Sequence, residues 1–168
     1  MGKMRVIVAL LSLSIMAYEA DAHFEEAQVM HVGGKVMCQD CTKSWNQWIK
    51  GDRPIKGCKV SVTCLDERKR VLYYNSDDTD ADGEFDVIIS QVVYGKKLKP
   101  KDCLVRVVSS PDVACNVATN FGNGRTGVRL RQPNVRYKGM VKYLVGPFYY
   151  TTPMCEEPRD PNSAYHYH

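Results

Sequence analysis

Histidine is scarce in this sequence of 168 residues, and its placement limits the chemistry that the chain can perform. The four histidines are His23, His31, His166 and His168, so none lies between residues 32 and 165. A Ser–His or Cys–His nucleophile pair, or a zinc site built on histidine, would have to take its imidazole from the ends of the chain. The G-x-S-x-G and H-E-x-x-H patterns are also missing. These absences argue against hydrolases of those types, whereas a glycosidase that uses only carboxylates survives them, although so short a chain has little room for a deep sugar cleft. We predict a protein that is not an enzyme and has no catalytic residue, metal or cofactor.

Three further absences narrow the class of protein. No Asn-x-Ser/Thr sequence occurs, so N-glycosylation is not expected. Beyond the N-terminus no apolar run is long enough to span a membrane, and no hydrophobic C-terminal tail suggests a lipid anchor. The net charge is only +4, which gives no reason to expect nucleic acid as a partner. We expect a monomer that neither spans a membrane nor binds nucleic acid.

The N-terminus predicts secretion. Lys3 and Arg5 precede an apolar run over residues 6–17. Ala20 and Ala22 then form the A-x-A pattern of a signal-peptidase cleavage site. A basic start, an apolar stretch of about a dozen residues and small residues at the exit are typical of a signal peptide. The rival interpretation is a membrane anchor, but the run is too short to cross about 30 Å of hydrocarbon. We predict a signal peptide over residues 1–22, a domain over 23–155 and a flexible polar tail over 156–168.

Short apolar runs separated by turn signals predict an all-β domain. The expected strands cover residues 28–37, 58–64, 71–74, 84–89, 103–108, 128–130 and 140–145. Seven such strands favour a small antiparallel β-barrel or sandwich. The Gly33-Gly34 pair predicts a bulge or bend in the first strand. The clean alternation of residues 58–64 places Cys58, Val60, Val62 and Cys64 on the buried face. Residues 42–49 are compatible with one or two helical turns.

All seven cysteines lie after the signal peptide, at positions 38, 41, 58, 64, 103, 115 and 155. In an oxidising compartment such a set indicates a disulfide framework, and an odd number leaves one cysteine unpaired or bound to another chain. Cys38 and Cys41 form a C-x-x-C that would suggest a redox pair in a parallel α/β setting, which this sequence does not show. Structural disulfides are the favoured interpretation, and these observations leave their pairing open.

The run Asp78, Asp80, Asp82 and Gly83 matches the first half of a calcium-binding loop. The second half of the loop pattern is absent, because Ile89 occupies the position at which a calcium-binding loop needs a bidentate glutamate. An Asp-rich segment that ends in glycine is also a good hairpin turn. We therefore predict a turn and no metal site.

Basic and aromatic side chains are the candidates for binding. The basic residues form two clusters: Lys96, Lys97, Lys99 and Lys101, then Arg125, Arg129, Arg131, Arg136 and Lys138. A solvated surface is the default interpretation of such runs, and attraction to an acidic polysaccharide is the functional one. Trp45 and Trp48 could stack on sugars, although core packing is the commoner role of large aromatics. Tyr165 and Tyr167 are candidates for oxidative cross-linking by extracellular peroxidases.

The motifs around the cysteines resemble a known family. They are VGGKVMCQDC over residues 32–41, IKGCKVSVTC over 55–64, DADGEF over 80–85, CLVRVVSSP over 103–111 with Cys115, and VGPFYY over 145–150 before Cys155. In this order they resemble the plant pollen Ole e 1 allergen and extensin family. The likeness covers residues 29–155, which is most of the chain after the signal peptide.

This resemblance implies a secreted, disulfide-bonded protein of the plant extracellular matrix or cell wall. It implies the pairs Cys38–Cys115, Cys41–Cys155 and Cys64–Cys103, which leaves Cys58 as the odd thiol. Since the alternation places Cys58 on a buried face, we predict an unreactive thiol, the alternative being an exposed one that links two chains. The family has no established catalytic residue. Related modules on proline-rich arabinogalactan proteins are associated with pectic galactan, but this chain lacks their long proline-rich stretch.

We therefore expect a non-enzymatic wall protein that binds or organises pectic polysaccharide, with wall glycoproteins as further candidate partners. The predicted contacts are Lys96, Lys97, Lys99, Lys101, Arg125, Arg129, Arg131, Trp45 and Trp48. Two alternatives stay open. One is a structural wall protein cross-linked through Tyr165 and Tyr167, and the other is an extracellular ligand or modulator of a receptor or channel.

Overall fold

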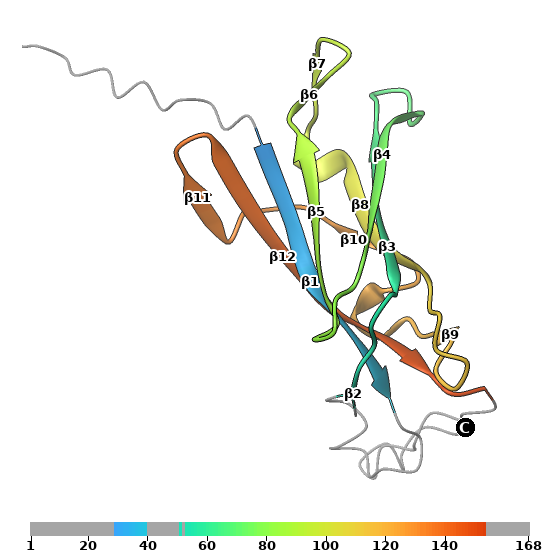
Figure 1. The fold of residues 1–168 in the computed structure, drawn as a ribbon. Coiled ribbons are helices and arrows are strands. Elements are labelled where there is room, and N and C mark those ends of the chain that lie inside the picture. Colours follow the sequence, from blue (N-terminus) through green and yellow to red (C-terminus); the bar gives the residue numbers. More distant parts are fainter. Residues whose placement is uncertain (1–28, 40–50, 52, 154–168) are drawn as a thin grey trace, which may run out of the picture.

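The structure is a computed structural model that describes residues 29–39, 51 and 53–153. Within these residues the chain is all-β, as predicted, with two short 3₁₀ turns and no α-helix (Figure 1). The predicted signal peptide, the tail over residues 156–168 and the candidate helical turns over residues 42–49 lie outside the described residues. None of the described helical segments is long and apolar enough to cross a membrane.

Two main sheets and a small hairpin make up the described fold. The first sheet has the order β11 (Val135–Tyr137), β12 (Met140–Thr151), β1 (Val29–Gln39) and β2 (Arg53–Pro54). In the same sheet β5 (Glu84–Ser90) pairs with β1, and β9 (Val117–Ala118) pairs with β12. The second sheet has the order β10 (Val128–Arg129), β8 (Cys103–Ser109), β3 (Lys59–Leu65) and β4 (Val71–Asp78). The hairpin is β6 (Val92–Val93) and β7 (Lys96–Lys97), and the 3₁₀ turns are η1 (Pro100–Asp102) and η2 (Phe121–Asn123).

The core lies between the two main sheets because alternate residues of their strands point inward. Val32 and Val36 of β1 face Val62 of β3 and Val105 of β8 within one cluster of buried residues. Phe148 of β12 is fully buried and stacks on Phe85 of β5, with ring centroids 6.1 Å apart. The predicted buried face of β3 is present, but Ser61 on the other face is buried as well.

The Gly33-Gly34 pair breaks the regular pairing of β1, as the sequence predicted. The register between β1 and β12 shifts between Gly34 and Val36. At Gly34 a side chain would run into the carbonyl of Val145 and come within 2.7 Å of the Phe85 ring. Only glycine allows β1 and β12 to approach each other this closely at the bulge.

Three predictions about the architecture were wrong in part. The described sheets do not close into a barrel, since β4 and β10 remain edge strands of their own sheet. The pairing of β1 with β12 is parallel, whereas an all-antiparallel fold was expected. The number of described strands is larger than seven, because β2, β6, β7, β9 and β11, of two or three residues each, were not predicted. Such short strands have no period that a sequence pattern can reveal, and the parallel pair joins segments about 110 residues apart in the chain.

The two sheets meet along two edges, which we call seams. The seam between β4 and β5 is closed by hydrogen bonds. The side chain of Asn75 on β4 donates to the carbonyl of Ile88 on β5 over 3.1 Å. The backbone N–H of Asp86 on β5 donates to the carboxylate of Asp77 on β4 over 3.0 Å. These contacts tie the edge strand of one sheet to that of the other. The opposite seam lies between β10 and β12.

Candidate functional site

The structure brings part of the two predicted basic clusters together. The guanidinium of Arg129 on β10 donates to the backbone carbonyl of Lys101 in η1 over 3.3 Å. This contact joins the end of the first cluster to the middle of the second. The turn between β3 and β4 adds further bases beside them. We call this region the basic end; its basic residues are Arg68, Lys69, Arg70, Lys96, Lys97, Lys99, Lys101, Arg129 and Arg131.

A groove of about 560 Å³ lies at the basic end, between the β3–β4 turn and the segment that contains Lys96 and Lys97. We call it the basic groove. Its walls also carry Asp66, Glu67 and Asp102, and ion pairs engage Arg70 and Lys99. Arg70 bonds Asp66 at 2.7 Å, and Lys99 bonds Glu67 at 2.8 Å. Both partners of the Lys99–Glu67 pair are exposed to water, where an ion pair contributes little to stability and can open easily. In the other pair Arg70 is exposed but the Asp66 side chain is only 16% exposed.

The pKa values of these paired groups follow their contacts. Hydrogen bonds from the backbone and then the side chain of Arg70 lower the pKa of Asp66. The Lys99 ammonium lowers the pKa of Glu67, and the same hydrogen bond raises the pKa of Lys99. Asp66, Glu67 and Lys99 are therefore charged near neutral pH, and the basic end keeps its excess of positive charge.

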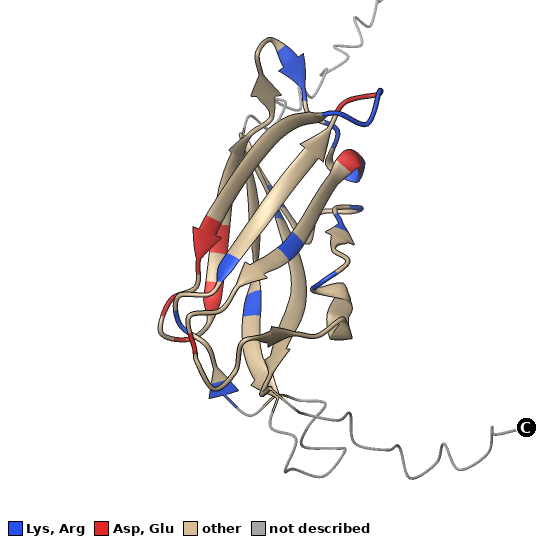
Figure 2. Ribbon diagram, turned by 90° about the vertical axis from the view of Figure 1, so that its right-hand side faces the viewer, with Lys and Arg blue, Asp and Glu red and all other residues tan. Residues whose placement is uncertain are grey.

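The charge of the molecule is polarised along its length. In Figure 2 the loops at the upper end carry more blue (Lys, Arg) than red, while most Asp and Glu gather around the turn between β4 and β5 at the lower left; further blue segments lie along the strands and at the lower end. The acidic residues of that turn and its flanking strands are Asp77, Asp78, Asp80, Asp82, Glu84 and Asp86. A separation of this kind steers an anionic partner toward one end of the molecule and away from the other.

The turn between β4 and β5 is held by hydrogen bonds and an ion pair of its own residues and their neighbours. The carboxylate of Asp80 accepts from the backbone N–H groups of Asp82 and Glu84, each over 2.9 Å, and Asp78 pairs with Lys59 at 2.8 Å. Two of the three carboxylates that match the first half of a calcium loop are thus engaged with protein groups. Among the described residues no cluster of three or more His, Cys, Asp and Glu side chains could hold a metal ion.

Other predicted binding residues are not part of the basic end. Arg125 follows Gly124, whose carbonyl accepts from the N–H of Val107, so it lies farther along β8. Arg136 and Lys138 lie on and beside β11 at the edge of the other sheet. Trp45 and Trp48, and the candidate cross-linking residues Tyr165 and Tyr167, lie outside the described residues.

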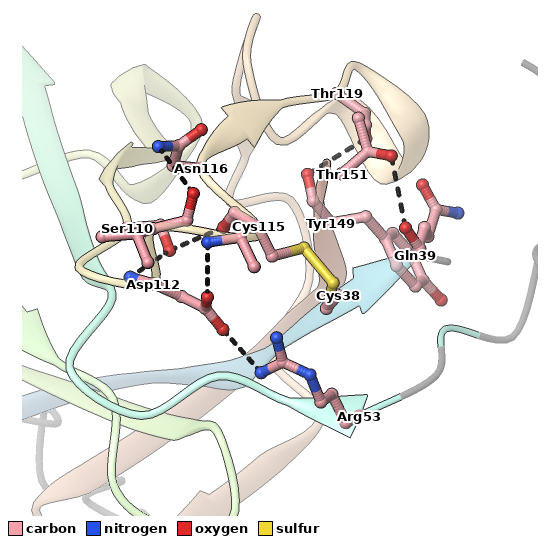
Figure 3. Close-up of a disulfide and its surroundings, with 12 residues drawn as sticks. Cys38, Gln39, Arg53, Ser110, Asp112, Cys115, Asn116, Thr119, Tyr149 and Thr151 are labelled. Carbon is pink, nitrogen blue, oxygen red and sulfur yellow. Dashed lines mark hydrogen bonds and ion pairs between the residues drawn. A yellow bond between two sulfur atoms is a disulfide. The ribbon is translucent and has the colours of Figure 1, made fainter. Parts of the chain in front are cut away.

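A disulfide and an ion pair hold the opposite end of the molecule (Figure 3). Cys38 at the end of β1 is bonded to Cys115. The loop before Cys115 is held by Asp112, whose carboxylate bonds Arg53 of β2 at 2.6 Å. Ser110 donates its hydroxyl to the carbonyl of Cys115 over 2.8 Å. These contacts tie a loop between the sheets to β1 and β2 of the first sheet.

We expect Asp112→Asn to lower the free energy of unfolding by about 1 kcal/mol near pH 6. The hydrogen bond from Arg53 lowers the pKa of Asp112. A folded-state pKa below the unfolded value of about 4 stabilises the fold above that pH, and the stabilisation is lost as the pH falls through the folded-state pKa. Urea unfolding at several pH values should therefore show a difference at pH 6 that vanishes below about pH 3.

The matched control is Asp78→Asn, which breaks the pair with Lys59. Both partners of that pair are about half exposed, at 42% for Lys59 and 57% for Asp78. Its cost should stay below about 0.5 kcal/mol. Equal losses in the two variants, or an Asp112→Asn effect that does not change with pH, would contradict the role assigned to Arg53 and Asp112.

The second disulfide lies inside the sheet. Cys64 of β3 and Cys103 of β8 stand directly opposite each other in the antiparallel register, and their sulfur atoms are bonded. Both observed pairs are those that the resemblance implies. The third implied pair, Cys41–Cys155, lies outside the described residues.

Cys58 carries a free thiol and is fully buried. Burial raises the pKa of the thiol, although hydrogen bonds with Ser110 and Thr79 act in the opposite direction. Its backbone N–H donates to the hydroxyl of Thr79 over 2.9 Å, so the segment that carries it is anchored in the core. A protonated, buried thiol is a poor nucleophile. Its lack of reactivity stays a prediction, for which rapid alkylation of the native protein would be the contrary result.

One pair of polar side chains, His31 and Asp86, has no signature in the sequence. The Nδ1 atom of His31 on β1 lies 2.7 Å from a carboxylate oxygen of Asp86 on β5. These residues are 55 positions apart, and no local pattern links them. The partners of His31 in the two neighbouring strands are Lys142 and Ile88. Neither of these two directly opposite residues is a hydroxyl or a thiol, so neither could act as the nucleophile of a nucleophile–His–Asp set.

Comparisons with known proteins give relatives among plant proteins. No protein-family model matches the chain. Proline-rich protein 1 of Arabidopsis thaliana is 30% identical over 137 residues, which cover 77% of this chain and 36% of that protein. The pistil-specific extensin-like protein of Nicotiana tabacum is 27% identical over 132 residues, which cover 79% of this chain and 27% of that protein. The chain thus spans about a third of the length of these curated relatives.

A solved structure shares the fold. The major plantain pollen allergen Pla l 1 superposes with a TM-score of 0.52 at 22% identity, over 74% of this chain and 94% of the allergen. At this identity the likeness shows the fold, while the sequence relatives come from extensin-like and proline-rich plant proteins. Together these findings confirm that the chain resembles the Ole e 1-like pollen allergen and extensin family, as the motifs around its cysteines predicted.

Proposed function

We propose that this chain is a secreted, non-enzymatic protein of the plant cell wall that binds acidic, pectic polysaccharide at its basic end. The observation that carries the proposal is the contact between Arg129 and Lys101, because it joins two basic segments into one surface. A pectic backbone is a polyanion, and clustered cations at one end of a polarised molecule attract a polyanion more strongly than dispersed ones.

The names of the relatives support the wall context. They include an extensin-like protein and a non-classical arabinogalactan protein of Arabidopsis thaliana, the latter 26% identical over 132 residues that cover 53% of its length. The two observed disulfides support an extracellular role as well, since disulfides persist in oxidising compartments. No catalytic function is part of the proposal.

The test is binding of the oxidised mature protein to immobilised polygalacturonate, with neutral galactan as the second ligand. We expect saturable binding to polygalacturonate that weakens as salt rises, because exposed charges are screened beyond about 10 Å at 0.1 M ionic strength. Lys96→Glu, Lys97→Glu and Lys101→Glu combined should weaken binding about tenfold or more, which corresponds to about 1.4 kcal/mol.

A matched control places the same charge change elsewhere. Lys35 belongs to β1, Lys56 precedes β3, and Lys59 is the first residue of β3, at the end of that strand opposite the β3–β4 turn. Reversal of these three lysines should leave most of the affinity in place. The proposal fails if the wild-type protein binds neither polymer, or if both triple variants lose affinity equally.

A further inference from the structure

A second and larger groove lies at the seam between the sheets that hydrogen bonds do not close. Its volume is about 840 Å³, and its walls come from β10 and the loop after it, from the loop around η2, and from residues 143–146 of β12. We call it the seam groove. It meets the basic end at Arg129 and Arg131, which line it.

The charges of the two grooves differ. The basic groove contains Asp66, Glu67 and Asp102, and two of its cations are neutralised by ion pairs. No Asp or Glu is among the described residues that line the seam groove. The only described contact of the Arg129 guanidinium is with a neutral carbonyl, and Arg131 forms no hydrogen bond or ion pair with another described residue. Two guanidinium groups therefore face this groove without a compensating carboxylate.

The backbone that carries the two arginines is held in place. Between them lies Leu130, which is buried at 1% exposure and donates its N–H to the carbonyl of Cys103 over 3.3 Å. Because Leu130 points into the core, Arg129 and Arg131 on either side of it are both exposed. The anchoring carbonyl belongs to a disulfide-bonded cysteine of β8, so the loop cannot easily move away.

The other walls of the groove are ordered as well. Asn134 accepts from the N–H of Leu144 over 2.7 Å through its side chain and donates its own N–H to the carbonyl of Lys142 over 2.8 Å. On the facing loop, Asn120 accepts from both the N–H and the hydroxyl of Thr126, each over 2.9 Å. Walls that are ordered before binding reduce the entropy lost when a ligand binds.

The chemistry of the lining fits a sugar acid. An arginine fork binds a carboxylate through two parallel hydrogen bonds, which a lysine ammonium cannot do. The exposed side chains of Asn123 and Gln132 form no hydrogen bond with another described residue, so their amides are available for hydroxyl groups. Leu104 and Leu144 add apolar surface on which a sugar ring can pack.

We propose that the seam groove binds uronic acid residues with free carboxylates, and that Arg129 and Arg131 distinguish them from methyl-esterified residues. This inference rests on the proposed binding of acidic polysaccharide and assigns its specificity to one groove. The basic end attracts the polyanion over a long range, whereas the seam groove recognises the carboxylate through direct hydrogen bonds from its arginines. An ester has no charge and cannot form the charge-assisted pair of hydrogen bonds, so it loses the contact with the arginines.

Calorimetric titration with a soluble oligogalacturonide tests this inference, with its fully methyl-esterified form as the comparison ligand. We expect the wild-type protein to bind the free acid about tenfold or more tightly than the ester. The double variant Arg129→Gln and Arg131→Gln should lose this preference. The matched control is Arg106→Gln with Arg125→Gln, which changes the charge equally at two exposed residues that do not line the groove.

The outcomes separate this inference from the proposed function. If the protein binds polygalacturonate but the groove variant and its control behave alike, the seam groove is not the site and the proposed function stands. If the wild type binds acid and ester equally, selectivity for carboxylates is wrong. If it binds no acidic saccharide at all, both proposals fail. Unchanged circular dichroism and unfolding midpoints in both variants would show that lost binding does not come from lost folding.

Discussion

Removal of the Cys64–Cys103 disulfide by Cys64→Ala and Cys103→Ala is expected to lower the free energy of unfolding by about 4 kcal/mol. The bond closes a loop with a sequence separation of 39, and both cysteines are almost completely buried. In the chain-entropy account, the cross-link restricts the unfolded ensemble, so its removal makes the unfolded state more favourable. Urea unfolding of the oxidised protein at neutral pH measures this difference.

Cys58→Ala is the control for this experiment. It removes a sulfur atom from the same core but opens no cross-linked loop, because Cys58 is unpaired. Its expected cost is about 1 kcal/mol, typical of a single substitution. If Cys58→Ala destabilised the protein as much as the double variant, the packing of sulfur in the core would explain the result, and the cross-link would contribute little.

Gly34→Val is expected to cost about 3 kcal/mol or more and to lower the midpoint of thermal unfolding by about 10 °C or more. A side chain at this bulge would collide with the carbonyl of Val145 and with the ring of Phe85. The carbonyl belongs to β12 and the ring to the buried core, so neither can move without breaking other contacts. Circular dichroism during heating measures the midpoint.

Gly139→Ala is the matched glycine control. Gly139 has a φ of +74°, but nothing lies within 4 Å of the position that a Cβ would occupy. Only the backbone conformation is then penalised, by about 1 kcal/mol. A loss at Gly34 no larger than the loss at Gly139 would mean that the bulge can relax around a side chain, contrary to the close approach of β1 and β12.

Predictions from local patterns were correct where one strand carries its own signal. The alternation of residues 58–64 and 103–108 matches the inward faces of β3 and β8, because side chains of a strand alternate between its two faces. The glycine pair predicted the bulge in β1 for a similar local reason. The parallel pairing of β1 with β12 was missed, since it depends on two segments at opposite ends of the chain.

The candidate site shows the same division. The sequence identified the two basic clusters, but it treated residues 125–138 as one group. The folded chain divides them, because Leu130 is anchored beside Cys103 while Gly124 is bonded to Val107 of the same strand. Arg129 and Arg131 thereby join Lys101, and Arg125 does not. The pair of His31 with Asp86 likewise exists only because β1 and β5 are neighbours.

The sequence by itself determined the β class, the bulge and the resemblance to the Ole e 1-like family, because each depends on residues close together in the chain. Tertiary structure decided how the strands of the two sheets are ordered, which arginines lie beside Lys101 and which seam holds a groove. These features depend on pairings between distant segments, and many alternative pairings satisfy the same local patterns of apolar and polar residues. The energy that selects among them comes from burying one common core, which no single segment contains.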